Sequence, residues 1–215
     1  MEKKITDKMD GVEVQPHIQL RKGQVQPVVL TMGDPKRVDQ VGQMVEGYKD
    51  LEFNREFKSL EAIQGGEKFT VISHARERDV CDLLVRPGFP AVTTPRVYQL
   101  LQQAAAQQQV TIKTGVVLTN GLFYGDQSHK ENLQYWSQFT DIVDCEFQCL
   151  FLVGSVRNIE TGGIATVDGS PLEWNQDNYD PTGRVVAEGK KKMLEIAIAA
   201  CVDLAREYRL KEEGK

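Results

Sequence analysis

The clearest strand signal of the chain lies in the stretch Gly162-Gly163-Ile164-Ala165-Thr166-Val167-Asp168-Gly169-Ser170-Pro171. Its apolar run, Ile164 to Val167, is short and follows two glycines, which predicts a buried strand rather than a helix. Asp168 stands at the C-terminal end of that strand, where a Gly-Ser-Pro turn begins. Ligands of open α/β sheets bind at this edge, and a carboxylate there can serve as a general acid. The alternative is that Asp168 only starts the turn, because aspartate is a common turn residue.

The composition is that of an ordinary globular protein. The chain has 215 residues, 40% of them hydrophobic and 27% charged, which suits one domain with a substantial core. Its net charge of -5 gives no reason to expect nucleic-acid or membrane partners. No apolar run has transmembrane length, and the start lacks the apolar core of a signal peptide. We therefore expect a single domain over residues 1–215, with a polar, flexible end at residues 1–16.

The cysteines and histidines favour a cytoplasmic protein without a bound metal. The cysteines are Cys81, Cys145, Cys149 and Cys201. They form no CxxC pair and lie in apolar surroundings, so we expect reduced thiols rather than disulfides or a zinc site. The histidines are His17, His74 and His129. Their spacing is not that of metal ligands, and we expect no cofactor.

Strands and helices alternate along most of the chain. The predicted strands are Val28–Met32, Leu51–Leu60, Lys68–Ser73, Val110–Leu118 and Ile164–Val167. Five helices are predicted: one after the Gly33–Arg37 turn, one that begins at Pro95 behind a Thr94 cap, one over Lys130–Phe139, one that begins after an Asp144 cap, and one over Thr182–Tyr208. This alternation predicts an α/β fold with a mixed central sheet flanked by helices.

The alternation breaks behind Lys68–Ser73. There the chain runs through His74 and Ala75 straight into Arg76-Glu77-Arg78-Asp79, and no helix-length segment separates this strand from the loop-like residues 80–93.

Six motifs in order along the chain resemble the nucleoside phosphorylase family, which contains the hexameric purine nucleoside phosphorylases and the uridine phosphorylases. They are Gln15-Pro16-His17-Ile18, Gly33-Asp34-Pro35-Lys36-Arg37-Val38, Asn54-Arg55-Glu56-Phe57, Phe123-Tyr124, Cys145-Glu146 and Val167-Asp168-Gly169-Ser170-Pro171. Together they cover nearly the whole chain. The last of them, followed by Trp174, is most similar to the purine-specific branch of protozoan parasites.

The resemblance implies a three-layer phosphorylase/hydrolase-like fold and a glycosyltransferase of purine salvage. The implied reaction is phosphorolysis of purine ribonucleosides, such as inosine or guanosine, to free base and ribose 1-phosphate. Phosphate would be a co-substrate, and no other cofactor is implied. The resemblance also implies a homo-oligomer, with a hexamer built as a trimer of dimers.

Phosphate and catalytic roles follow from the matching positions. Gly33 and Arg37 match the family's phosphate ligands, and Arg55 matches an arginine that reaches a neighbouring subunit's phosphate. A backbone N–H and guanidinium groups suit a dianion. Asp168 matches the residue that protonates purine N7 and so improves the leaving group. From the residues alone, an arginine such as Arg37 is more often a solvated cation at a helix start.

Nucleoside-binding roles follow in the same way. Glu146 matches the carboxylate that accepts hydrogen bonds from the 2′- and 3′-hydroxyls, although it also suits a helix start through the dipole. Cys145 stands where many relatives have methionine, and His17 matches a histidine donated to the neighbour's 5′-hydroxyl. The implied aromatic groups are Phe123 or Tyr124, which would stack on the base, and Trp174, which would close the pocket.

The resemblance also identifies what is absent after Ala75. The family has a glycine-rich loop, a helix and a strand ending in a phosphate arginine motif at this point, on the order of 30–40 residues, the size of a βα unit. We therefore expect one central βα unit to be missing, through a splice or gene-model artefact, a real truncation or a dropped segment. The alternatives to purine phosphorolysis are a nucleosidase, a uridine phosphorylase, and a non-catalytic paralogue that binds nucleoside or assembles with full-length subunits.

Overall fold

The structure is a computed structural model, and it describes residues 14–74, 84–86, 88–122, 124–173 and 184–214. The chain divides into two compact units, the first formed by Met1–Ala75 and Ala205–Lys215 and the second by Arg76–Leu204. The boundary at Ala75 is the point at which the sequence loses its alternation. Residues 1–13 of the end predicted to be flexible (1–16) lie outside the described residues, as do Cys81, Phe123, Trp174 and the predicted helix start at Thr182.

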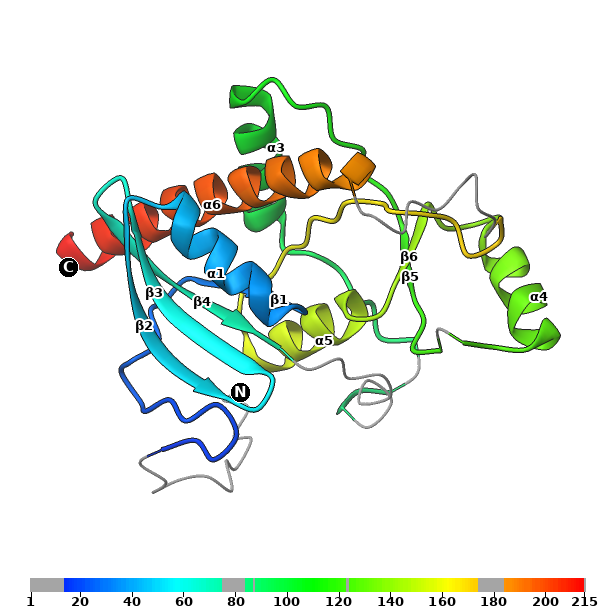
Figure 1. The fold of residues 1–215 in the computed structure, drawn as a ribbon, viewed down its shortest axis with the longest axis horizontal. Helices are drawn as coiled ribbons and strands as arrows, with labels where there is room; N and C mark the ends of the chain where they lie inside the picture. Colours follow the sequence, from blue (N-terminus) through cyan, green and yellow to red (C-terminus); the bar gives the residue numbers. More distant parts are fainter. Residues whose placement is uncertain (1–13, 75–83, 87, 123, 174–183, 215) are drawn as a thin grey trace. The chain divides into compact units, whose positions relative to one another are not determined.

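A four-stranded mixed sheet organises the first unit (Figure 1). Its strands, in sheet order, are β1 (Val29–Met32), β4 (Glu67–Ser73), β3 (Phe57–Gln64) and β2 (Gly47–Asn54). β1 runs parallel to β4, and the other two pairings are antiparallel. The mixed α/β architecture predicted from the alternation is confirmed.

Helix α1 (Pro35–Met44) packs against β1, β3 and β4 in this unit (Figure 1). Its N-terminus is set by Asp34, whose Oδ1 accepts a hydrogen bond of 3.0 Å from the Lys36 N–H, and by the proline that follows. Val38 and Val41, which have helical spacing, are both 0% exposed and form the buried face of this helix.

The single strand predicted over Leu51–Leu60 is wrong, because two strands meet there. β2 and β3 form a hairpin in which Asn54 pairs with Phe57 and Arg55 has a left-handed φ of 56°. A non-glycine residue with positive φ is uncommon, so the sequence carries no obvious turn signal at this point. A register shift between Asp50 and Glu52 further blurs the alternation.

The second unit holds a short parallel pair of strands, β5 (Val117–Thr119) and β6 (Ile142–Asp144). Its helices are α3 (Pro95–Gln107), α4 (Gln127–Trp136), α5 (Phe147–Arg157) and α6 (Arg184–Glu213), whose residues from Ala205 on belong to the first unit. Its core joins α3 to α6 through Leu100, Ala104, Ala105, Ile196 and Ala200. These helices confirm the predicted ones, with bounds that shift by a few residues.

Two predicted strands of this unit do not form at their predicted lengths. Of Val110–Leu118 only the end belongs to β5, and Ile164–Val167 is irregular, with Val167 61% exposed. Ile164 still packs against the helical core. A strand needs a neighbouring backbone for its N–H and C=O groups, and among the described residues of this unit β5 and β6 pair only with each other. The βα unit expected after Ala75 would contribute such a neighbour.

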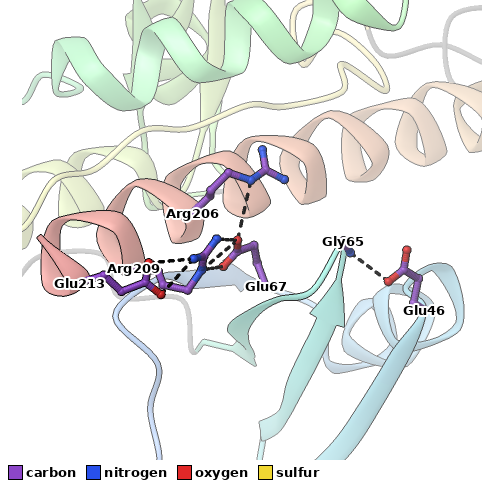
Figure 2. A network of polar contacts seen from close by, with 6 residues as sticks. All are labelled: Glu46, Gly65, Glu67, Arg206, Arg209 and Glu213. Atoms are coloured by element: carbon purple, nitrogen blue, oxygen red, sulfur yellow. Dashed lines mark hydrogen bonds and ion pairs between the residues drawn. The ribbon is translucent and has the colours of Figure 1, made fainter.

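A buried carboxylate ties the chain's C-terminal turns to the sheet of the first unit (Figure 2). The Glu67 side chain is 6% exposed and accepts hydrogen bonds from Arg209, at 2.8 Å from Nη2 to Oε1 and 3.2 Å from Nε to Oε2. Arg206 lies 3.7 Å from the same carboxylate, and Arg209 also bonds to Glu213 at 3.1 Å. The Arg209 hydrogen bonds lower the pKa of Glu67 below its ordinary value of 4.5, against the opposing effect of burial.

The same figure shows a second carboxylate that closes a turn of this sheet. Glu46 Oε2 accepts a hydrogen bond of 2.9 Å from the Gly65 N–H, in the turn between β3 and β4 (Figure 2). Gly65 and Gly66 both have positive φ there, which explains why glycines occupy the turn.

We predict that Glu67→Gln destabilises the protein at neutral pH and weakens its acid dependence. A depressed carboxyl pKa contributes stability above about pH 4.5, and this contribution is lost as the pH falls through the folded-state pKa. Thermal unfolding between pH 3 and 7 measures both effects. Glu213→Gln is the control, because Glu213 is 57% exposed. Equal losses for the two variants at every pH would contradict this role of Glu67.

Candidate functional site

One edge of the four-stranded sheet gathers the predicted phosphate ligands. Met32 pairs with Ser73 where the parallel strands β1 and β4 end, so Gly33 and His74 follow side by side. The His74 N–H donates to the Met32 carbonyl at 2.9 Å, and its Nδ1 lies 2.7 Å from the Thr31 hydroxyl. This β1–β4 edge is the position where ligands of open α/β sheets bind.

Arg37 lies beside this edge in the first turn of α1. Its Nε is 4.0 Å from Asp34 Oδ2, and its side chain is 34% exposed. A long, partly exposed ion pair is weak, so the guanidinium can exchange its partner for a bound anion at small cost. The N-terminus of α1 adds a positive dipole at the same place.

Arg55 and His17 lie at the same end of the sheet. Ser73 Oγ donates to the Glu56 carbonyl at 2.6 Å, which places the β2–β3 turn beside the end of β4. Asn54 Nδ2 donates to the His17 carbonyl at 2.6 Å, so the His17 loop is fastened to that turn. Both Arg55 and His17 are exposed. Nothing in the sequence indicated Ser73, because its hydroxyl contacts the Glu56 carbonyl only once β2 and β3 form their hairpin.

The parallel pair of the second unit has a corresponding edge. Thr119 and Asp144 pair where β5 and β6 end. The loop with Tyr124 follows β5, and Cys145 and Glu146 follow β6, so predicted nucleoside ligands share this β5–β6 edge. Tyr124 is 90% exposed. Phe123 and Trp174 lie outside the described residues.

The predicted roles of Asp144 and Glu146 at the start of α5 need correction. Asp144 ends β6, a strand that the sequence did not reveal, and Glu146 rather than Asp144 occupies the N-cap position. The Asp144 side chain nevertheless caps the helix, because its Oδ2 accepts from the Glu146 N–H at 2.9 Å and from the Phe147 N–H at 2.6 Å. The Glu146 side chain makes no capping hydrogen bond.

Asp168 follows an irregular segment, which pairs with no strand among the described residues, rather than the predicted strand. That segment is fastened to α6, where Thr166 Oγ1 donates to Met193 Sδ at 3.5 Å and Asp168 Oδ2 lies 3.8 Å from Lys190 Nζ. The Asp168 side chain is 61% exposed. The segment also packs against α5 at Gly163, where a Cβ atom would lie 2.8 Å from the Phe147 ring. The second unit therefore holds both predicted carboxylates, Glu146 on α5 and Asp168 on the segment between α5 and α6.

Among the described residues there is neither a metal-binding cluster nor a disulfide. No group of three His, Cys, Asp or Glu side chains there could hold a metal ion. Cys145, Cys149 and Cys201 are present as thiols, and burial raises the pKa of Cys201 to about 12, which makes that thiol unreactive. Among the described helices, none is both long and apolar enough to cross a membrane.

Comparison with known proteins decides the family. Residues 69–203 match the sequence profile of the phosphorylase superfamily. The chain belongs to this superfamily. It is 31% identical to a purine nucleoside phosphorylase of Plasmodium vivax, over 93% of this chain and 100% of the relative. It is 29% identical to a purine nucleoside phosphorylase of Plasmodium falciparum, over 89% of this chain and 97% of the relative.

Solved structures agree with this membership of the superfamily. The crystal structure of Toxoplasma gondii purine nucleoside phosphorylase in complex with immucillin-H superposes with a TM-score of 0.87 at 32% identity, covering 92% of this chain and 99% of that one. A uridine phosphorylase from Vibrio fischeri has a TM-score of 0.70 at 18% identity, over 92% and 99% of the chains, which shows a shared fold.

The alignment also measures what this phosphorylase lacks. It spans 248 positions against the Plasmodium vivax enzyme, while 93% of the 215 residues, about 200, take part. About 48 residues of the relative therefore face a gap in this chain. These unmatched residues, summed over the whole alignment, are enough to include a βα unit of roughly 30–40 residues such as the one that the sequence predicts to be absent.

We predict that Gly163→Ala destabilises the protein by about 1–3 kcal/mol, because the added methyl group overlaps the Phe147 ring. Urea unfolding measures the change. Gly47→Ala is the control, because no atom lies within 4 Å of a Cβ at Gly47 and the change should stay within about 0.5 kcal/mol. Equal stability of the two variants would show that Gly163 is not closely packed against α5.

Proposed function

We propose that this protein is a purine nucleoside phosphorylase of purine salvage, which converts inosine or guanosine and phosphate to the free base and ribose 1-phosphate. The observation that carries the proposal is the pair of carboxylates in the second unit, Glu146 at the β5–β6 edge and Asp168 beside α6. The similarity to Plasmodium vivax purine nucleoside phosphorylase over that relative's whole length supports it.

The proposed reaction breaks the bond from C1′ to the purine nitrogen and forms a bond from a phosphate oxygen to C1′. Asp168 gives its proton to purine N7, so the electron pair of the breaking bond ends on a neutral base. Glu146 accepts hydrogen bonds from the 2′- and 3′-hydroxyls and holds the sugar in place. Tyr124, which is 90% exposed, or Phe123 would stack on the base. Trp174 would close the pocket, and Cys145 would pack beside Glu146.

Phosphate requires cations and N–H donors. In our proposal the Gly33 N–H, the N-terminus of α1 and Arg37 bind the dianion, because helix N-termini and guanidinium groups favour bound phosphate. Arg55 and His17 would complete the site of a neighbouring subunit, which suits their exposure. We therefore propose a homo-hexamer that acts in the cytoplasm, with residues 1–215 as one phosphorylase domain and phosphate as co-substrate without any other cofactor.

Hydrolysis is the second candidate function. About 48 residues of a relative have no counterpart here, and the unit expected to be missing carries the family's principal phosphate arginine. A site with weaker phosphate binding leaves room for water as the nucleophile.

The test is release of hypoxanthine from inosine by the purified protein, with and without phosphate. We predict phosphate-dependent release together with ribose 1-phosphate. Equal release in both conditions would indicate a nucleosidase. The absence of release from folded protein that binds inosine would indicate a non-catalytic paralogue, and preferred cleavage of uridine would indicate a uridine phosphorylase.

Asp168→Asn is predicted to lower kcat by about 10²–10⁴, because an amide cannot transfer the proton to N7. Steady-state kinetics with inosine measures the effect. Asp50→Asn is the control, since Asp50 is an exposed carboxylate on β2. Asp168→Asn with unchanged kcat would remove Asp168 from the proposed mechanism.

A further inference from the structure

Glu146 has an unusual position for a residue proposed to bind substrate. It is the N-cap residue of α5, with φ of -134° and ψ of -25°, yet its side chain does not cap the helix. An N-cap carboxylate ordinarily accepts from the N–H groups of the first turn. Another group must satisfy those donors if the Glu146 carboxylate is to receive a sugar hydroxyl.

Asp144 at the end of β6 and Thr119 at the end of β5 supply acceptors for this helix start. One oxygen of Asp144, Oδ2, accepts from the Glu146 N–H at 2.9 Å and from the Phe147 N–H at 2.6 Å. These two bonds fix the backbone of Glu146 on both sides of its Cα atom. The direction in which the Glu146 side chain leaves the backbone therefore depends on Asp144.

Thr119 fixes the other oxygen of Asp144 from the neighbouring strand. Its hydroxyl donates to Asp144 Oδ1 at 2.5 Å and accepts from the Gln148 N–H at 3.0 Å. Both roles of the hydroxyl are thus defined, as a donor to the carboxylate and an acceptor from the helix. Thr119 and Asp144 are direct partners in the parallel register of β5 and β6, and both side-chain contacts are partly buried.

We infer that Thr119 and Asp144 are positioning residues for ribose recognition by Glu146. This inference rests on the proposed function, because it requires that Glu146 binds the 2′- and 3′-hydroxyls. The two strands and the first turn of α5 form one hydrogen-bonded unit, and a shift of the N-cap residue moves the carboxylate away from the sugar. Misplacement of a substrate-positioning group by about 1 Å can cost on the order of 100-fold in rate.

The closing experiment compares Thr119→Val with Thr119→Ser. Valine keeps the shape of threonine and removes both hydrogen bonds, whereas serine keeps both. We measure kcat/KM for inosine and for 2′,3′-dideoxyinosine, which lacks the hydroxyls that Glu146 is proposed to hold. We expect Thr119→Val to lose on the order of 100-fold with inosine and only a few-fold with the dideoxy compound. Thr119→Ser should remain close to the unchanged protein with both substrates.

A second comparison separates positioning from a general loss of structure. In a Glu146→Ala background the added Thr119→Val substitution should cost little more, since the group being positioned is already gone. Asp144→Asn, which keeps one acceptor oxygen, serves in place of Thr119→Val if the valine variant fails to fold by its thermal transition. Equal losses for inosine and the dideoxy compound, or none, would overturn this inference alone. Failure of the unchanged protein to bind or cleave inosine would overturn the proposed function and this inference with it.

Discussion

Parallel strand pairing is the constraint on which the candidate residues of each unit depend. Parallel neighbours end at the same edge of a sheet, so the loops that follow them must emerge together. β1 and β4 thereby bring Gly33 next to His74, and β5 and β6 bring Thr119 next to Asp144. A helix begins close behind each of these strand ends, α1 after Asp34 and α5 after Asp144 and Cys145–Glu146. Both edges therefore join a strand end, a capping aspartate and a helix N-terminus, an arrangement suited to binding polar substrates.

Local sequence signals predicted those parts whose determinants are themselves local. Asp34 and Pro35 mark the start of α1, Thr94 and Pro95 mark that of α3, and the buried stripe of Val38 and Val41 has helical spacing. The predictions from the sequence were wrong where contacts between residues distant in the chain determine the local structure. The β2–β3 turn places Arg55 at positive φ without a glycine that would signal the turn in the sequence. β6 has three residues, too few for a recognisable alternation of polar and apolar positions. Thr119 could be recognised as a candidate residue only from the pairing of β5 with β6, which places it opposite Asp144.

The fate of Ile164–Val167 shows what a strand pattern cannot guarantee. Its apolar, β-branched sequence favours a strand, but a strand exists only beside another backbone, and here the segment is held instead by Ile164 in the helical core and by Thr166 on Met193. The residues of the relative without a counterpart here, about 48 over the whole alignment, are numerous enough to include a neighbouring strand. We expect the loss to spare the carboxylates proposed for the nucleoside and to weaken phosphate binding. Gly33 and Arg37 are proposed to remain for phosphate, while the arginine of the βα unit expected after Ala75 would be absent.

The central claim is that the loss of the unmatched residues weakens phosphate binding and leaves nucleoside binding intact. Calorimetric titration with inosine and with phosphate tests it directly. The chain is compared with a variant in which the βα unit expected after Ala75 is inserted between Ala75 and Arg76, with a sequence taken from the Toxoplasma gondii enzyme. We predict that the restored chain binds phosphate at least about tenfold more tightly, as expected for one added charge-assisted contact, while the dissociation constant for inosine changes by less than about threefold. Equal phosphate affinity of the two chains, or inosine binding only by the restored one, would contradict the account.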